Sequence, residues 1–203
     1  MVVGVTRYLA SVLVLFLLGR AVIAAAPAKN LTDLRRSVFT LHVEQGEDAY
    51  SRCTAFAVGN KTFVTASHCV PDASVKIYLL DARGRLWPAD VSAFDAALDV
   101  ATVQSEMAAD PLALGDDPFE DDPVLSINGV GGNVLWSLRG RVAGQDRQWI
   151  GMQLSGAGPG GSGAPVLCKG EFVCGIVLGA FSTGTLVRML PISAWRQLLD
   201  TKA

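Results

Sequence analysis

The sequence has little positive charge and few histidines. Its 17 Lys and Arg residues are outnumbered by 19 Asp and Glu residues, and the pair Arg35-Arg36 is its largest basic cluster. Because nucleic acids are bound through a continuous positive surface, this composition disfavours a nucleic-acid partner. The net charge of −2 also gives no strong reason to expect an acidic substrate. With only His42 and His68 present, any chemistry that needs an imidazole depends on one of them.

The chain also lacks an uninterrupted apolar run of the roughly 20 residues that a membrane-spanning helix needs. The run "YLASVLVLFLLG" (8–19) is shorter, follows Arg7, and leads through Arg20 into small residues that end at Ala28. This pattern predicts a secretory signal peptide over residues 1–28, with cleavage after Ala28. The alternative is an uncleaved anchor, and only then would a membrane be a partner.

Cysteines are few, and their number is even. Cys53, Cys69, Cys168 and Cys174 follow the predicted signal, and an even count in a secreted chain indicates two disulfides. Three pairings are possible, and the most local one joins Cys53 to Cys69 and Cys168 to Cys174. A zinc site is disfavoured, because the spacing is unusual and no histidine lies near Cys168. These features predict a secreted or periplasmic protein without a bound metal.

Long helical patterns are missing until the end of the chain. Short apolar segments recur about every ten residues between Gly, Pro, Asp and Asn, which is typical of an all-β barrel or sandwich. "ISAWRQLLD" (192–200) predicts a terminal helix, with Ser193 as N-cap. The acidic stretch 114–123 reads as a linker between two β units. The expected strands are 37–44, 53–59, 61–66, 74–80, 85–94, 99–104, 123–129, 133–144, 148–154, 164–168, 171–179 and 185–190.

Three short stretches carry candidate chemistry. His68 lies in "VTASHCV", Ser162 in the glycine loop "GPGGSGAPV", and Asp99 at the start of the apolar run "DVATV". Each is ambiguous alone: glycine-serine runs are often linkers, and an acid at a strand end is often a turn residue. Asp95, four positions earlier, competes with Asp99 for the role of the acid. By contrast, His42 alternates with apolar neighbours, which places it outward, and it is expected to be an exposed or edge histidine.

The order His68, Asp99, Ser162 is one known for catalytic triads, in which a carboxylate orients the imidazole that activates a serine hydroxyl. "TASHC", "DVAT", "GGSGAPV", "CGIVLGAFSTG" and "PISAWRQLL" together resemble the motifs of trypsin-like serine peptidases. The resemblance spans residues 37–200. It implies an all-β fold of two antiparallel six-stranded barrels, over about 37–115 and 123–190, within a peptidase domain of residues 29–203.

The resemblance also assigns roles to residues. His68 would be the general base, Asp99 its orienting acid and Ser162 the nucleophile, with the N–H groups of Gly160 and Ser162 forming the oxyanion hole. The pair Cys53–Cys69 matches the disulfide that braces the histidine loop in this family.

Two positions depart from the family pattern. Gly161 stands where many members have an Asp that pairs with a newly cut N-terminus, which points to the bacterial and viral members that need no such activation. Ala164 replaces a glycine of the family motif.

The predicted function is a secreted serine endopeptidase that acts on proteins or peptides, works as a monomer and needs no cofactor. Residues 155–160 and 177–181 would line its primary specificity pocket. Because neither segment carries a charged residue, the side chain before the scissile bond (P1) is expected to be small or apolar. The alternatives are a non-catalytic binding module on the same fold and a membrane-anchored processing peptidase.

Overall fold

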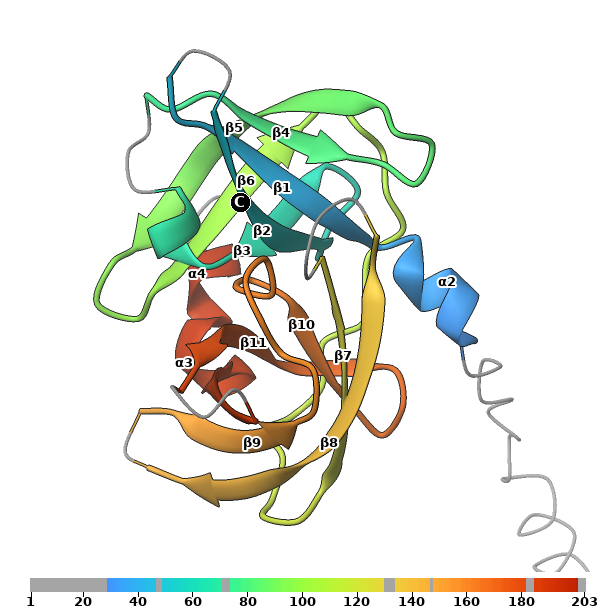
Figure 1. Ribbon diagram of the computed structural model, residues 1–203, viewed down its shortest axis with the longest axis vertical. Helices are drawn as coiled ribbons and strands as arrows, with labels where there is room; N and C mark the ends of the chain where they lie inside the picture. The colour runs from blue at the N-terminus through green and yellow to red at the C-terminus, as the bar shows by residue number, and fades with distance from the viewer. Residues whose placement is uncertain are drawn as a thin grey trace, which may run out of the picture.

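The computed structural model describes residues 29–46, 49–70, 74–129, 134–146, 148–181 and 185–200. The predicted signal peptide, residues 1–28, lies outside these ranges. Two closed antiparallel barrels of six strands each, stacked one above the other, confirm the predicted fold class (Figure 1).

Barrel one is formed by the first six strands and closes because β1 pairs with both β2 and β4. Barrel two is formed by the remaining six and closes through β10, which pairs with β11 and β7. The strands of barrel one are β1 (Val38–Glu44), β2 (Tyr50–Ala57), β3 (Thr62–Thr65), β4 (Ile77–Leu80), β5 (Leu86–Asp95) and β6 (Val100–Ser105). Those of barrel two are β7 (Pro123–Asn128), β8 (Trp136–Gln145), β9 (Ile150–Leu154), β10 (Pro165–Cys168), β11 (Phe172–Ala180) and β12 (Leu186–Pro191).

The environment of His42 differs from the sequence prediction. Its strand, β1, has a paired neighbour on each side, and His42 faces Arg52 on β2 and Tyr78 on β4. The His42 side chain is buried and packs beside the Tyr50 ring, with 6.0 Å between ring centroids. The expectation of an exposed or edge histidine was therefore wrong, because β1 lies between two strands and the side chain is covered. The alternation itself holds, since Leu41 and Val43 belong to the barrel-one cluster and His42 does not.

Apolar side chains form one cluster inside each barrel and a third cluster between them. The shared cluster combines Phe56 and Val64 of barrel one with Ile127 and Leu167 of barrel two. Trp195, 1% exposed, also belongs to it and meets Phe56 edge-on at a centroid distance of 6.2 Å. This packing fixes how the two barrels lie against each other.

The C-terminal helical segment consists of two short turns, α3 (Ile192–Trp195) and α4 (Gln197–Asp200). Ser193 lies inside α3, which is preceded by Pro191 as N-cap residue, so the predicted cap was placed two positions too late. Ser193 instead donates its N–H and its hydroxyl to the carboxylate of Asp117, at 3.0 and 2.5 Å. The acidic stretch between the barrels is thereby tied to the terminal helix.

A further helix, α2 (Leu31–Arg35), precedes β1 and was not expected from the sequence. Asn30 caps it by accepting a hydrogen bond from the Asp33 N–H, and Leu34 packs into the shared cluster. Within the described ranges, the helices are all too short to cross a membrane.

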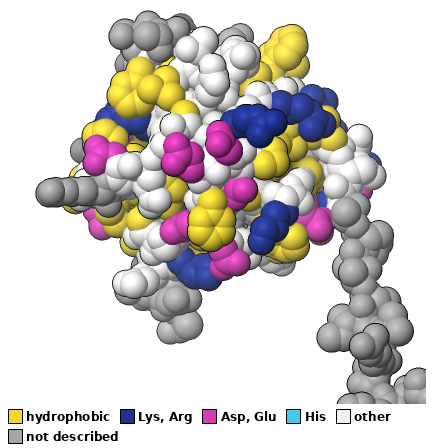
Figure 2. Space-filling view, turned by 90° about the horizontal axis from the view of Figure 1, so that it is seen from below, with side chains coloured by type: hydrophobic (Ala, Val, Ile, Leu, Met, Phe, Trp, Pro, Cys, Tyr) yellow, Lys and Arg dark blue, Asp and Glu magenta, His cyan; other side chains and the backbone are white. Residues whose placement is uncertain are grey.

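Two disulfides are present. One joins Cys53 of β2 to Cys69, and the other joins Cys168 to Cys174 across the β10–β11 hairpin. Figure 2 shows one face of the molecule, on which lysine and arginine side chains lie among acidic and apolar ones and do not merge into a continuous positive surface.

Candidate active site

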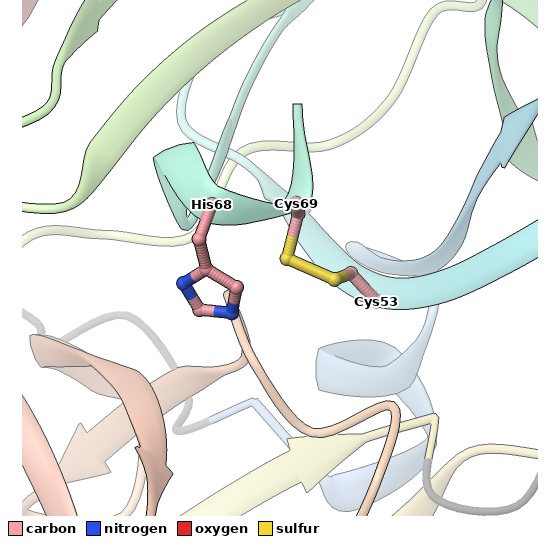
Figure 3. A group of neighbouring side chains, drawn as sticks. All are labelled: Cys53, His68 and Cys69. Carbon is pink, nitrogen blue, oxygen red and sulfur yellow. A yellow bond between two sulfur atoms is a disulfide. The ribbon is translucent and has the colours of Figure 1, made fainter. Parts of the chain in front are cut away.

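His68 lies in a single turn of 3-10 helix, η1 (Ser67–Cys69), directly after β3. The next residue, Cys69, is bonded to Cys53 of β2, so a covalent link holds the turn against barrel one. The disulfide lies beside the His68 ring (Figure 3). The ring itself is about half exposed, with 48% of its side-chain surface accessible. It is therefore firmly anchored yet open to solvent.

The potential ligand atoms of Cys53, His68 and Cys69 lie within 4.8 Å of one another, a grouping that could suggest a metal site. Both sulfur atoms, however, are bonded to each other. A disulfide sulfur is not the thiolate that zinc and similar metals require. The grouping thus reflects how the disulfide supports the histidine turn.

Asp99 directly precedes β6 and contacts His68 through its carboxylate. The Nδ1–H of His68 donates to Oδ2 at 2.8 Å, and the His68 main-chain N–H donates to Oδ1 at 2.9 Å. The hydroxyl of Ser67 donates to the same Oδ1 at 3.0 Å. The backbone of Asp99 has φ of +58°, an uncommon conformation that Asp tolerates better than most residues.

These contacts decide the charge of the Asp99 carboxyl. Partial burial acts to raise its pKa, but the hydrogen bonds from His68 and Ser67 together outweigh that effect and hold the pKa below its usual range. An ionised carboxylate only accepts hydrogen bonds, so the bonded Nδ1 of His68 must carry the proton. In the neutral imidazole this leaves Nε2 unprotonated and able to accept a proton.

The competing acid, Asp95, has a different environment. Its carboxylate accepts hydrogen bonds from the N–H groups of Ala97 and Leu98, at 2.9 and 3.0 Å, within the turn that links β5 to β6. Asp95 is therefore the turn residue, and Asp99 is the acid beside the histidine.

Ser162 lies in the glycine-rich loop between β9 and β10, which reaches barrel one at the junction of the two barrels (Figure 1). Its carbonyl accepts a hydrogen bond from the Thr54 N–H at 2.8 Å. The next residue, Gly163, has φ of +82°, and a Cβ there would lie 2.9 Å from the N of Ala66, two residues before His68. This close approach brings the serine loop and the histidine turn together from opposite barrels.

The hydroxyl of Ser162 donates to the carbonyl of Leu178 at 3.4 Å, a long hydrogen bond. Among the described residues, no hydrogen bond joins this hydroxyl to His68. Rotation about one side-chain bond reorients a serine hydroxyl, and contacts in the absence of a substrate are often looser than those in a substrate complex.

The N–H groups of the loop alternate between two uses. Those of Gly161 and Gly163 donate to the carbonyls of Gly158 and Val177, at 3.1 and 2.8 Å. Within the described part of the chain, the N–H groups of Gly160 and Ser162 donate to no protein acceptor. These are the two donors that the resemblance to trypsin-like peptidases assigned to an oxyanion hole, and both remain available to a ligand.

A pocket of about 260 Å³ lies beside Ser162. Both segments predicted to form it contribute, and among the described residues its lining carries no charged side chain. The lining includes the apolar side chains of Leu154, Ala157, Val177, Ala180 and Val187, together with Asn128.

Two residues around this site were missed from the sequence. Ser67 occupies a position where the related motif commonly has Ala, and that departure was the available signal. Thr54 is fully buried in β2, and its hydroxyl contacts the serine loop. Its contribution depends on contacts between the two barrels, which local sequence does not reveal.

The paired barrels define the class: this is the chymotrypsin fold of serine peptidases, with the candidate residues at the junction of the barrels. The sequence model of the trypsin-like peptidase domain matches residues 53–176, and the chain belongs to that family. No curated protein gives a significant match to the sequence.

Among solved structures, the chain is similar to the active form of the Rv3671c protease from M. tuberculosis, with a TM-score of 0.74 and 17% sequence identity. The match covers 83% of this chain and 82% of that one. At this identity the likeness supports the fold.

Proposed function

We propose that the protein is a secreted serine endopeptidase that hydrolyses peptide bonds through Ser162, His68 and Asp99. The observation that carries the proposal is the contact between His68 Nδ1 and the Asp99 carboxylate at 2.8 Å, on the barrel that the Ser162 loop approaches. Family membership supports the same reaction class.

In the proposed reaction, Ser162 Oγ attacks the scissile carbonyl carbon while His68 Nε2 takes the hydroxyl proton. The carbonyl π electrons move to oxygen, and the N–H groups of Gly160 and Ser162 stabilise the resulting oxyanion. Collapse of this intermediate breaks the C–N bond, and His68 gives its proton to the leaving amine. Water then attacks the acyl-enzyme by the same steps, with His68 again as base, which releases the acid and restores the serine. Asp99 stabilises the imidazolium in both halves.

The charge-free pocket supports a small or apolar P1 residue, because a buried Lys, Arg or Glu side chain would lack an opposite charge there. Digestion of a peptide library by the mature protein tests this preference. Dominant cleavage after a charged residue contradicts it.

The two disulfides support action in an oxidising compartment, outside the cytosol. We propose that the protein is exported by residues 1–28 and acts as a monomer. Mass spectrometry of the mature N-terminus tests the cleavage and separates the secreted form from an anchored processing peptidase. Size-exclusion chromatography tests the oligomeric state.

The contact of Ser162 Oγ with Leu178, rather than His68, is the observation that would suit a non-catalytic binding module on this fold. A fluorophosphonate probe separates the two functions, because it phosphonylates only an activated serine. We expect labelling of the wild-type protein and cleavage of denatured casein, and neither with Ser162→Ala. A folded wild-type protein that takes up no probe would leave the binding module as the better account.

A further inference from the structure

Thr54 connects the two barrels at the Ser162 loop. It lies on β2 of barrel one and is fully buried, yet its hydrogen bonds reach residues of barrel two. A buried polar side chain is retained at low cost only when its hydrogen bonds are satisfied. The hydroxyl of Thr54 meets that condition through two partners outside its own barrel.

The orientation of this hydroxyl is fixed from both sides. Oγ1 accepts the N–H of Gly129 at 3.0 Å and donates its own hydrogen to the carbonyl of Gly160 at 2.7 Å. Gly129, which donates to this hydroxyl, directly follows β7, and Gly160, which accepts from it, belongs to the serine loop. Because the single hydroxyl hydrogen is committed to Gly160, the Gly160 carbonyl is held in one direction.

The main chain of Thr54 adds a second attachment. Its N–H donates to the carbonyl of Ser162 at 2.8 Å, and its own carbonyl accepts the hydroxyl of Thr65 at 2.8 Å. Thr54 therefore holds the carbonyls of Gly160 and Ser162, the two residues whose N–H groups are proposed to form the oxyanion hole.

Such support matters because of the conformation of Gly160. Its φ is +95°, and glycine has the widest choice of backbone conformations. Stabilisation of an oxyanion by N–H groups depends on donors that are already in place before the reaction. Without an anchor on its carbonyl, Gly160 has no side chain to restrict it.

The geometry points to Thr54 as a positioning residue for the oxyanion hole, acting through its hydroxyl on Gly160. The inference rests on the proposed function. Thr54 does not touch the substrate. It keeps Gly160 in the one conformation that presents its N–H beside that of Ser162.

The test compares Thr54→Val, which keeps the shape and the main-chain bonds but removes the hydroxyl, with Thr54→Ser, which keeps the hydroxyl. The readout is the burst of p-nitrophenolate from p-nitrophenyl acetate, in which Ser162 Oγ forms the acetyl ester and His68 takes its proton. Rates are normalised by fluorophosphonate titration of competent sites. The saturating acylation rate constant and the apparent dissociation constant are measured separately.

We expect Thr54→Val to lower the saturating rate constant about 10- to 100-fold, somewhat less than the loss of a direct oxyanion donor. The apparent dissociation constant should change less than about threefold, and Thr54→Ser should retain the wild-type rate within about threefold. Thr54→Ala provides the same comparison where the valine variant does not fold.

Thr102→Val is the matched control. Thr102 is also a buried threonine of barrel one, and its hydroxyl bonds to Ser92 at 2.8 Å, away from the serine loop. The Thr102→Val substitution should lower the melting temperature but leave the acylation rate constant within about threefold of the wild-type value. A Thr54→Val protein that melts earlier but acylates at the wild-type rate would make Thr54 merely structural. Equal losses in the Ser and Val variants would also refute the role of the hydroxyl. If even the wild type shows no Ser162-dependent burst, both the proposed function and this inference are refuted.

Discussion

Replacing Gly163 with alanine should disable the site by displacing Ser162. A Cβ at this position would lie 2.2 Å from the Thr54 carbonyl oxygen and 2.4 Å from Thr65 Oγ1. The first distance is about 1.2 Å short of the 3.4 Å at which ordinary contact begins. Both atoms belong to residues of hydrogen-bonded strands, Thr54 of β2 and Thr65 of β3, so the loop has to move instead. A displacement of about 1 Å can cost on the order of 10²-fold in rate, and we expect a loss of that size in the rate of fluorophosphonate labelling.

Gly170→Ala separates displacement from backbone strain. Gly170 has φ of +85°, close to the +82° of Gly163, but a Cβ there would meet no atom within 4 Å. Both variants bear the left-handed backbone penalty of about 1–2 kcal/mol, which lowers the melting temperature of a protein of this size by roughly 2–8 °C. Gly170→Ala should keep its labelling rate. Equal rates in Gly163→Ala and the wild type, or equal losses in the two variants, would refute the reasoning.

Three further predictions concern Asp99, Asp81 and the first disulfide. Ser67→Ala removes one donor to Asp99 and should lower kcat/KM about threefold to tenfold without changing the fold, as measured by steady-state kinetics and circular dichroism. Burial acts to raise the pKa of Asp81, but hydrogen bonds from three residues that follow it in the chain hold the pKa well below its usual value. The ionised Asp81 therefore stabilises the folded protein at neutral pH, and this contribution is lost as the pH falls. Asp81→Ala should melt earlier than the wild type at pH 7, and the difference should shrink below about pH 4; a constant difference across this range contradicts the assignment. Replacing both Cys53 and Cys69 with serine removes a disulfide between residues 16 positions apart. It should lower the free energy of unfolding, measured by chemical denaturation, by about 3 kcal/mol.

The sequence predicted the strands well because their signals are local. Short apolar segments between turn residues placed twelve strands close to their observed bounds, and the order of three motifs selected the fold. Barrel closure is not local, and the error over the exposure of His42 arose there: β1 lies between β2 and β4, and neighbouring side chains such as Tyr50 cover the outward-facing ring.

The candidate site was predictable only where its residues carry a local sequence signal. His68 and Ser162 stand out through their neighbours in the sequence, whereas Asp99 was favoured over Asp95 only by the family motif, and their hydrogen bonds now separate the two acids. The buried hydroxyl of Thr54 meets the serine loop across a separation of 106 residues. No pattern within β2 marks that residue as different from a core threonine.

The apolar cluster shared by the barrels has a consequence for biosynthesis. Trp195 and Ile192 of α3 complete this cluster, and α3 follows both barrels in the chain. Barrel one can begin to fold while barrel two is still being translated, because domains of a nascent chain fold from the N-terminal side. Barrel-two residues such as Ile127 and Leu167 can cover part of the surface that barrel one offers, but the cluster is complete only once α3 has been synthesised. The interface between the barrels, where the proposed site lies, should therefore reach its final packing only after the ribosome has passed α3.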